Sequence, residues 1–104
     1  MTRMPELPTI TPDQLDQLPG PEWMLLDVRT DAEWAQGRIE GSIHIPLDQL
    51  IARIDEVSDR VVCICAVGGR SAQATAYLNS IGREAVNLDG GIQSWASGSR
   101  PLAR

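Results

Sequence analysis

The sequence predicts one α/β domain, a mainly parallel sheet of four or five strands with helices on both faces. Two apolar runs, at residues 23–28 and 61–65, are typical of strands buried on both faces. Helix signals alternate with the strand signals, which is the order of parallel strand–helix–strand units. A chain of 104 residues, with 42% hydrophobic and 22% charged residues, has the size and balance of a single globular domain.

The first helix is expected directly after a short strand at residues 9–11. Thr11 has the pattern of a capping residue, because Pro12 follows at the first helical position and Gln14 comes three residues after the cap. The Pro-Gly-Pro sequence at residues 19–21 is expected to end this helix.

A second short helix is expected after the first buried run. Thr30 and Glu33 form another capping box, and Gly37 is expected to close the helix. Residues 43–45 then predict a short strand that Pro46 ends.

An amphipathic helix is expected from Pro46 to about Val57, because apolar residues recur there at helical spacing. The apolar positions are Leu47, Leu50, Ile51 and Ile54, and the solvated face is expected to carry Asp48, Asp55, Glu56 and Asp59.

The same alternation continues to the end of the chain. A helix is expected to begin at Ser71 and to close at Gly82, followed by a strand at residues 85–88. A Gly-Gly turn at residues 90–91 then leads into a short helix at residues 92–95.

Charge and composition exclude several function classes. Fourteen acidic and nine basic residues give a net charge of −5, whereas nucleic-acid binding needs clustered basic side chains. No apolar run approaches the roughly 18 residues of a membrane span. One His and two Cys fall short of a four-ligand zinc site unless carboxylates help, and no metal is expected. The first residues lack the apolar core of a secretory signal, and with two cysteines this favours the reducing cytoplasm.

The segment that follows the second buried run combines several features of a reactive cysteine site. Cys65 stands at the carboxyl end of a strand, where ligands bind in open α/β sheets. Gly68 and Gly69 permit a turn whose amides face inward, and the helix that begins at Ser71 adds its own free amides. Such a setting stabilises a thiolate, and Arg70 would add a donor for an anionic substrate. A tight turn with a buried, inert cysteine is the alternative.

The chain resembles the rhodanese, or sulfurtransferase, family at this loop. Residues 65–71 match the active-loop pattern of single-domain rhodaneses: Cys, two residues, Gly, one residue, Arg, Ser. Other segments resemble further family boxes: residues 26–29 with 33–37, residues 37–46, and residues 88–92 with Trp95 and Pro101. The sequence departs from the family at Arg38, where His is general, and at Ser42, where Ala is common.

The resemblance implies a rhodanese-like fold and a division of the chain into three parts. These are an N-terminal extension at residues 1–8, the rhodanese domain at residues 9–101 and a C-terminal tail at residues 102–104. It also implies that Cys65 takes a sulfane sulfur from thiosulfate or a persulfide donor and passes it to cyanide or a thiol, without a cofactor. Such covalent transfer predicts ping-pong kinetics. The substrate-binding residues implied are Ala66, Val67, Gly68, Gly69, Arg70 and Ser71.

Two other functions stay open. A rhodanese-like sulfur carrier or regulatory module would pass its sulfur to a dedicated protein partner, and nothing in the loop distinguishes that acceptor from a small molecule. A cysteine phosphatase or arsenate reductase is disfavoured, because those loops place five residues between Cys and Arg and only four intervene here. The physiological donor, the acceptor and the oligomeric state do not follow from the sequence.

Supporting roles are expected for two residues at the end of the first buried strand. Asp27 either bonds the amides of the active loop or caps the backbone locally, and Arg29 is expected to pair with Glu33 four residues later. Cys63 is expected to be a small buried residue, although its spacing from Cys65 also permits a redox interpretation.

The remaining aromatic residues are expected to be structural. His44 is interpreted as a surface or hydrogen-bonded histidine and not as a base. The three tryptophans are expected to fill the core of a chain that has no Phe; they are Trp23, Trp34 and Trp95.

Overall fold

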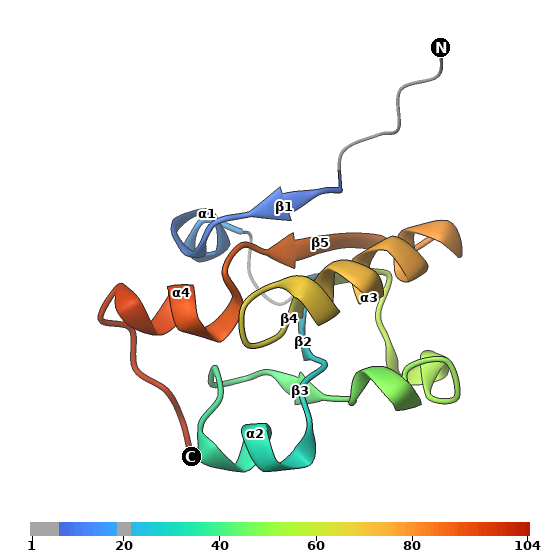
Figure 1. Ribbon diagram of the computed structural model, residues 1–104. Coiled ribbons are helices and arrows are strands. Elements are labelled where there is room, and N and C mark those ends of the chain that lie inside the picture. The colour runs from blue at the N-terminus through green and yellow to red at the C-terminus, as the bar shows by residue number, and fades with distance from the viewer. Residues whose placement is uncertain (1–6, 19–21) are drawn as a thin grey trace.

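A five-stranded parallel sheet lies at the centre of the molecule (Figure 1). The computed structural model describes residues 7–18 and 22–104. The strands are β1 (Thr9–Ile10), β2 (Met24–Asp27), β3 (Ile43–His44), β4 (Arg60–Ile64) and β5 (Glu84–Leu88). Their order is β1-β5-β4-β2-β3, and each neighbouring pair is parallel, which confirms the predicted class.

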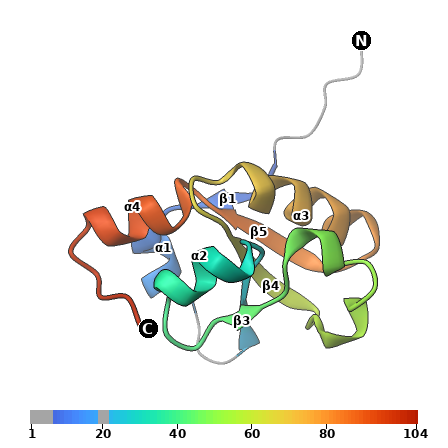
Figure 2. The same cartoon turned by 60° about the horizontal axis from the view of Figure 1, so that its bottom comes forward.

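Helices and apolar clusters cover both faces of the sheet. The helices are α1 (Pro12–Asp16), α2 (Asp31–Gln36), α3 (Gly69–Ser80) and α4 (Gly91–Ser97). One cluster contains Cys63 and Cys65 together with Leu78 of α3. The other contains Val62 and Ile64, against which residues of α1 and α4 pack. Figure 1 and Figure 2 both show α1 and α4 as neighbours. Successive residues of β4 therefore face different helices, as expected of a strand buried on both faces.

Both predicted capping boxes are confirmed. The Thr11 hydroxyl accepts a hydrogen bond of 3.2 Å from the Gln14 amide, and the Gln14 side chain accepts one of 2.8 Å from the Thr11 amide. Thr30 and Glu33 make the same reciprocal pair at the start of α2, with distances of 3.3 and 3.0 Å. The expected helix stop at residues 19–21 lies outside the described residues.

The predicted continuous helix between Pro46 and Val57 is wrong. Two 3₁₀ turns, η2 (Leu47–Gln49) and η3 (Ile54–Glu56), take its place. Most of the backbone hydrogen bonds here span three residues and not four, which tightens the chain. Leu50 and Val57 are buried against the α3 side of the sheet, whereas Ile51 is 70% exposed. Helical spacing alone does not distinguish two anchored turns from one helix.

The end of the chain is packed against the domain. Ala103 and Arg38 exchange two backbone hydrogen bonds of 2.9 and 2.7 Å. Leu102 packs against the apolar cluster on the α1 and α4 side of the sheet. Arg100 donates to Asp13 and Asp16 of α1. These contacts join the last residues to two distant segments of the chain.

The tryptophans do not fill the deep core. Trp23 and Trp95 are half-buried and pack on the outside of the cluster beside α1 and α4. Trp34 packs against neither cluster: its ring is stacked on His44 at 4.8 Å between centroids, and Arg38 lies over it at 4.7 Å. The core expectation is therefore wrong for Trp34, and Arg38 has a structural role.

Among the residues that the structure describes, no helix is both long and apolar enough to cross a membrane.

Candidate active site

Cys65 follows β4 directly and opens the loop that leads into α3. Cys65 is buried, with only 1% of its surface exposed to solvent. The loop backbone is fixed from the other side, because the amides of Ile92 and Gln93 donate to the carbonyls of Cys65 and Ala66 over 2.8 and 3.1 Å. Gly91 makes this approach possible, since a Cβ atom there would lie 2.2 Å from the Cys65 carbonyl oxygen. The first turn of α4 is thus a support for the loop.

Two donors reach the sulfur of Cys65. The Gly68 amide lies 3.0 Å from Sγ and the Ser71 hydroxyl lies 3.2 Å from it. Gly68 adopts a φ of 108°, which glycine tolerates, and it caps the start of α3. Burial on its own raises the pKa of the Cys65 thiol, but hydrogen bonds from Ser71 and the loop amides outweigh it and lower that pKa. These hydrogen bonds therefore stabilise the negative charge of a Cys65 thiolate.

The remaining loop residues differ in exposure. Ala66 is half-buried, Gly69 is exposed at the start of α3, and Val67 is 62% exposed at the rim. Ser71 is completely buried in the first turn of α3. The structure therefore brings the predicted loop residues together around Cys65, with an apolar side chain at the outer edge.

Arg70 is bound to Glu33 of α2 by two hydrogen bonds of 2.7 and 2.8 Å. The pair lowers the pKa of Glu33 to about 2, chiefly through the Arg70 hydrogen bond, and raises the pKa of Arg70. The expected side-chain pair between Arg29 and Glu33 is wrong, because the contact between them runs from the Arg29 side chain to the backbone carbonyl of Glu33 and not to its carboxylate. The guanidinium of Arg70 is therefore shared with a carboxylate before any substrate arrives.

Asp27 and Arg29 form a buried pair beside the loop. The Asp27 carboxylate accepts from Arg29 Nε and Nη2 over 2.9 and 2.8 Å, and from the Arg29 backbone amide over 3.0 Å. Arg29 also donates to the Gly37 carbonyl over 2.7 Å. The described hydrogen bonds of Asp27 go to Arg29 and not to the loop amides, which favours the local structural role among the two left open.

Two hollows flank the loop and share Arg29 in their walls. One, of about 330 Å³, is lined by Val28, Arg29, Thr30, Pro46, Leu47, Asp48 and Arg70. The other, of about 170 Å³, is lined by Arg29, Ala66, Val67, Ile92 and Gln93. Each hollow has loop residues in its wall, Arg70 in the first and Ala66 and Val67 in the second.

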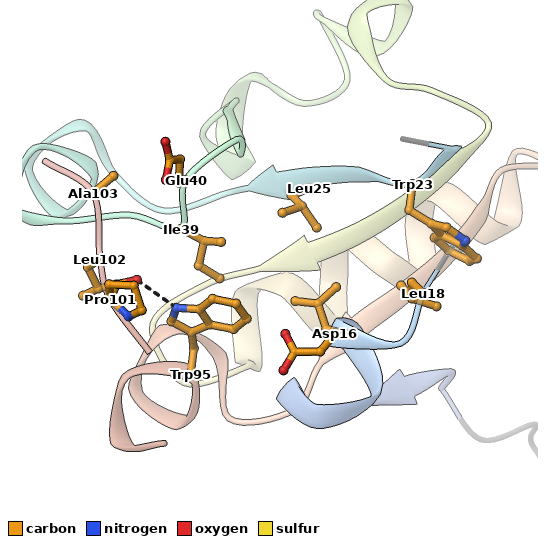
Figure 3. Close-up of a pocket in the computed structure, with 11 residues that line it drawn as sticks. Asp16, Leu18, Trp23, Leu25, Ile39, Glu40, Trp95, Pro101, Leu102 and Ala103 are labelled. Atoms are coloured by element: carbon orange, nitrogen blue, oxygen red, sulfur yellow. Dashed lines mark hydrogen bonds between the residues drawn. The ribbon is translucent and has the colours of Figure 1, made fainter. Parts of the chain in front are cut away.

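A larger pocket of about 430 Å³ lies on the face covered by α1 and α4 (Figure 3). Figure 3 shows Trp95, Ile39 and Leu25 along its wall, with the carboxylates of Asp16 and Glu40 at its edge. Its lining contains no cysteine, histidine or hydroxyl nucleophile. The candidate nucleophile, Cys65, lies instead at the loop that follows β4.

Cys63 and His44 are structural in this arrangement. Cys63 is buried and its thiol is free; burial raises its pKa to about 11, so it stays protonated at neutral pH. His44 Nε2 lies 2.7 Å from the Arg29 carbonyl oxygen, and this contact with the Trp34 stack confirms a hydrogen-bonded histidine. Within residues 7–18 and 22–104, no group of three His, Cys, Asp or Glu side chains could hold a metal ion.

Asn87 is a site residue that the sequence patterns did not single out. It lies in β5, is only 7% exposed, and accepts a hydrogen bond from the Ser71 hydroxyl. Its Nδ2 donates to the Gly68 carbonyl over 3.3 Å. The available signal was a polar residue among the apolar residues of the strand predicted at residues 85–88, shortly before the Gly-Gly turn.

Comparisons with known proteins agree with this geometry. The rhodanese-like domain family matches residues 11–98. A sulfurtransferase of Allochromatium vinosum is 44% identical over 82 residues, which cover 76% of this chain and 77% of that protein. A thiosulfate sulfurtransferase of Pseudomonas fluorescens is 31% identical over 90% of this chain and 89% of its own. The crystal structure of a rhodanese-related protein from Thermoplasma volcanium superposes with a TM-score of 0.85 at 33% identity, covering 92% of this chain and 97% of that one.

Proposed function

The chain belongs to the rhodanese-like domain family, and we propose that it is a sulfurtransferase that carries a sulfane sulfur on Cys65 as a persulfide. The observation that supports this most directly is the sulfur's surroundings. Sγ accepts hydrogen bonds from the Gly68 amide and the Ser71 hydroxyl, and the pKa of the thiol is lowered. A thiolate is the nucleophilic form of cysteine, so no separate base is needed.

In the first step the Cys65 thiolate attacks the outer sulfur of thiosulfate. A bond forms between Sγ and that sulfur, the original S–S bond breaks, and sulfite leaves with its electron pair. The outer sulfur of the resulting persulfide carries the negative charge, which the loop amides and the N-terminus of α3 stabilise. In the second step a thiolate or cyanide attacks the outer sulfur, and the Cys65 thiolate leaves unchanged. No external oxidant or reductant is consumed.

Thiosulfate is proposed as the donor because the two hollows beside the loop have basic side chains in their walls. Both arginines already have carboxylate partners, Asp27 for Arg29 and Glu33 for Arg70. We therefore assign most of the anion binding to the loop amides and a smaller part to Arg70. A relative named as a thiosulfate sulfurtransferase, at 31% identity, supports the same donor.

The acceptor is proposed to be a small thiol, cyanide or a thiol of a protein partner. Val67 is 62% exposed at the rim of the loop, where an acceptor of either kind would approach. Both cysteines are free, which fits a reducing compartment such as the cytoplasm. Phosphatase activity is not proposed, since four residues separate Cys65 from Arg70 and a phosphoryl group needs a wider loop.

The test is the mass of the intact protein after incubation with thiosulfate. The parent and the Cys63→Ser variant should each gain one sulfur atom, which cyanide then removes, and the Cys65→Ser variant should gain none. No gain in a folded parent with a free Cys65 thiol would contradict thiosulfate as the donor. Loading of Cys65→Ser would contradict the assignment of the nucleophile.

A further inference from the structure

The hydroxyl that contacts the Cys65 sulfur has two acceptors within reach. Ser71 Oγ lies 3.2 Å from Sγ and also within hydrogen-bond distance of Asn87 Oδ1. A serine hydroxyl carries a single hydrogen, so it donates to only one of them at a time. The oxygen keeps lone pairs for a donor such as a thiol S–H.

The orientation of the Asn87 amide follows from its other contact. Nδ2 faces the Gly68 carbonyl at 3.3 Å, and a carbonyl requires a donor. Oδ1 therefore faces Ser71 as an acceptor. Asn87 and Ser71 are both nearly or fully buried, so water does not readily replace a missing partner.

We propose that Asn87 is a positioning residue that competes with the Cys65 sulfur for the single hydrogen of Ser71. When Cys65 is a thiol, Ser71 donates to Asn87, and the thiol S–H donates to Ser71 Oγ. When the sulfur is a thiolate, Ser71 turns its hydrogen to the sulfur and Asn87 loses that bond. Asn87 thus opposes ionisation of Cys65 while it holds Ser71 in place. This inference rests on the proposed role of Cys65 as the sulfur-carrying thiolate.

Other charged and polar side chains near Cys65 could also affect its pKa. Arg70 and Cys63 interact electrostatically with Cys65, and Arg29 shares a hollow with the loop. The charged or titratable side chains are Arg70 from α3, Arg29 from the segment after β2 and Cys63 from β4. The elements α4 and β5 contribute the neutral amides of Gln93 and Asn87. Asn87→Leu and Ser71→Ala leave Arg70, Cys63 and Arg29 unchanged and introduce no charge.

The test is the pKa of Cys65, read from the pH dependence of its alkylation by iodoacetamide and located by peptide mass. Asn87→Leu should lower this pKa by about one unit, because Ser71 then donates only to the sulfur. Ser71→Ala should raise it, because a donor to the thiolate is lost. In the Ser71→Ala background the Asn87→Leu change should have no effect. The Gly68 carbonyl stays paired in these variants, since it also accepts from the Ala72 amide.

Asn79 supplies a matched control. It also joins α3 to β5, through hydrogen bonds of 2.9 and 2.8 Å with the backbone of Ala85, but it does not reach the sulfur. Asn79→Leu should leave the pKa of Cys65 unchanged. If Asn87→Leu does not fold, Asn87→Asp replaces it: a stronger acceptor should raise the pKa, by more with Ser71 present than in the Ser71→Ala background.

Two outcomes would overturn the proposal. One is an Asn87→Leu variant whose Cys65 pKa is unchanged or raised, because Asn87 would then only hold Ser71 in place. The other is an equal effect of Asn87 with and without the Ser71 hydroxyl. Neither depends on sulfur transfer, because alkylation reports the thiolate alone. Failure of persulfide formation is therefore distinguishable from failure of this inference.

Discussion

The Glu33 carboxylate of α2 holds the Arg70 guanidinium of the active loop by two hydrogen bonds of 2.7 and 2.8 Å. The same carboxylate also caps its own helix by accepting from the Thr30 amide over 3.0 Å. One side chain thus sets the start of α2 and the position of the loop arginine. Any role of Arg70 in donor binding has to compete with Glu33.

Glu33→Gln should strengthen thiosulfate binding. Gln preserves the capping geometry at Thr30 but removes the charge that occupies Arg70, so the guanidinium becomes free for the donor's oxyanion. We expect the KM for thiosulfate to fall by about two- to fivefold with little change in kcat, as for release of an ion pair that is about one third exposed.

Glu56→Gln is the matched control for that experiment. Glu56 also binds an arginine through two hydrogen bonds, 2.8 and 2.9 Å from Arg53, but the pair lies outside the lining of both loop hollows. Its KM should equal that of the parent. An unchanged or higher KM in Glu33→Gln would show that Arg70 does not contact thiosulfate.

The Glu33–Arg70 pair should also make stability depend on pH in an acid window. The pKa of Glu33 is about 2 in the folded protein against 4.5 for the unperturbed group, so the pair stabilises fully above pH 4.5. That stabilisation is lost as the pH falls from 4.5 toward 2. Because both side chains are about one third exposed, its size should not exceed about 1 kcal/mol.

Urea unfolding of the parent and of Glu33→Gln between pH 7 and pH 3 measures this effect. The difference in the free energy of unfolding should be constant down to about pH 5 and shrink below it. A difference that stays constant to pH 3 would mean that the pair contributes no charge-dependent stability.

Gly91→Ala should disrupt the active loop. A Cβ atom at Gly91 would lie 2.2 Å from the Cys65 carbonyl oxygen, and the φ of 59° is unfavourable for alanine as well. We expect a loss of at least about 2 kcal/mol in unfolding free energy and loss of persulfide loading.

Gly41→Ala separates the two causes. Gly41 has a φ of 85°, but a Cβ there would meet nothing within 4 Å. Gly41→Ala should lose only about 1 kcal/mol of unfolding free energy, the cost of a positive φ for alanine, and should still form the persulfide. Equal losses of unfolding free energy in Gly91→Ala and Gly41→Ala would show that the clash with the Cys65 carbonyl does not destabilise the protein.

Local patterns predicted the parts of this structure that local chemistry decides. The capping boxes at Thr11 and Thr30 and the strand–loop–helix that presents Cys65 all depend on neighbours within a few residues. Contacts between residues that are far apart in the sequence could not be predicted from these local patterns. Glu33 and Arg70 are 37 residues apart in the sequence, and Ser71 and Asn87 are 16 residues apart. Each pair is in contact because the order of the strands in the sheet brings their elements together.

The turns between Pro46 and Val57 show a second limit. Apolar spacing correctly indicated the burial of Leu50 but wrongly placed Ile51, which is 70% exposed, on the apolar face. It did not indicate the hydrogen-bond pattern, which depends on how β3 is joined to β4 past the intervening β2. Apolar periodicity therefore determines neither the burial of every apolar residue nor the pattern of backbone hydrogen bonds.

Asp27→Ala should destabilise the fold more than it impairs sulfur transfer. Asp27 is fully buried and Arg29 is 5% exposed, so the substitution leaves a guanidinium charge without its carboxylate in the interior. Removal of one partner of a buried pair typically costs about 3–5 kcal/mol. The double variant Asp27→Ala/Arg29→Met should recover part of that loss in urea unfolding, because no unpaired charge remains. Persulfide loading per folded molecule should persist in Asp27→Ala, since Asp27 bonds Arg29 and not the loop amides; loss of loading in a fully folded Asp27→Ala protein would instead assign the carboxylate to the active loop.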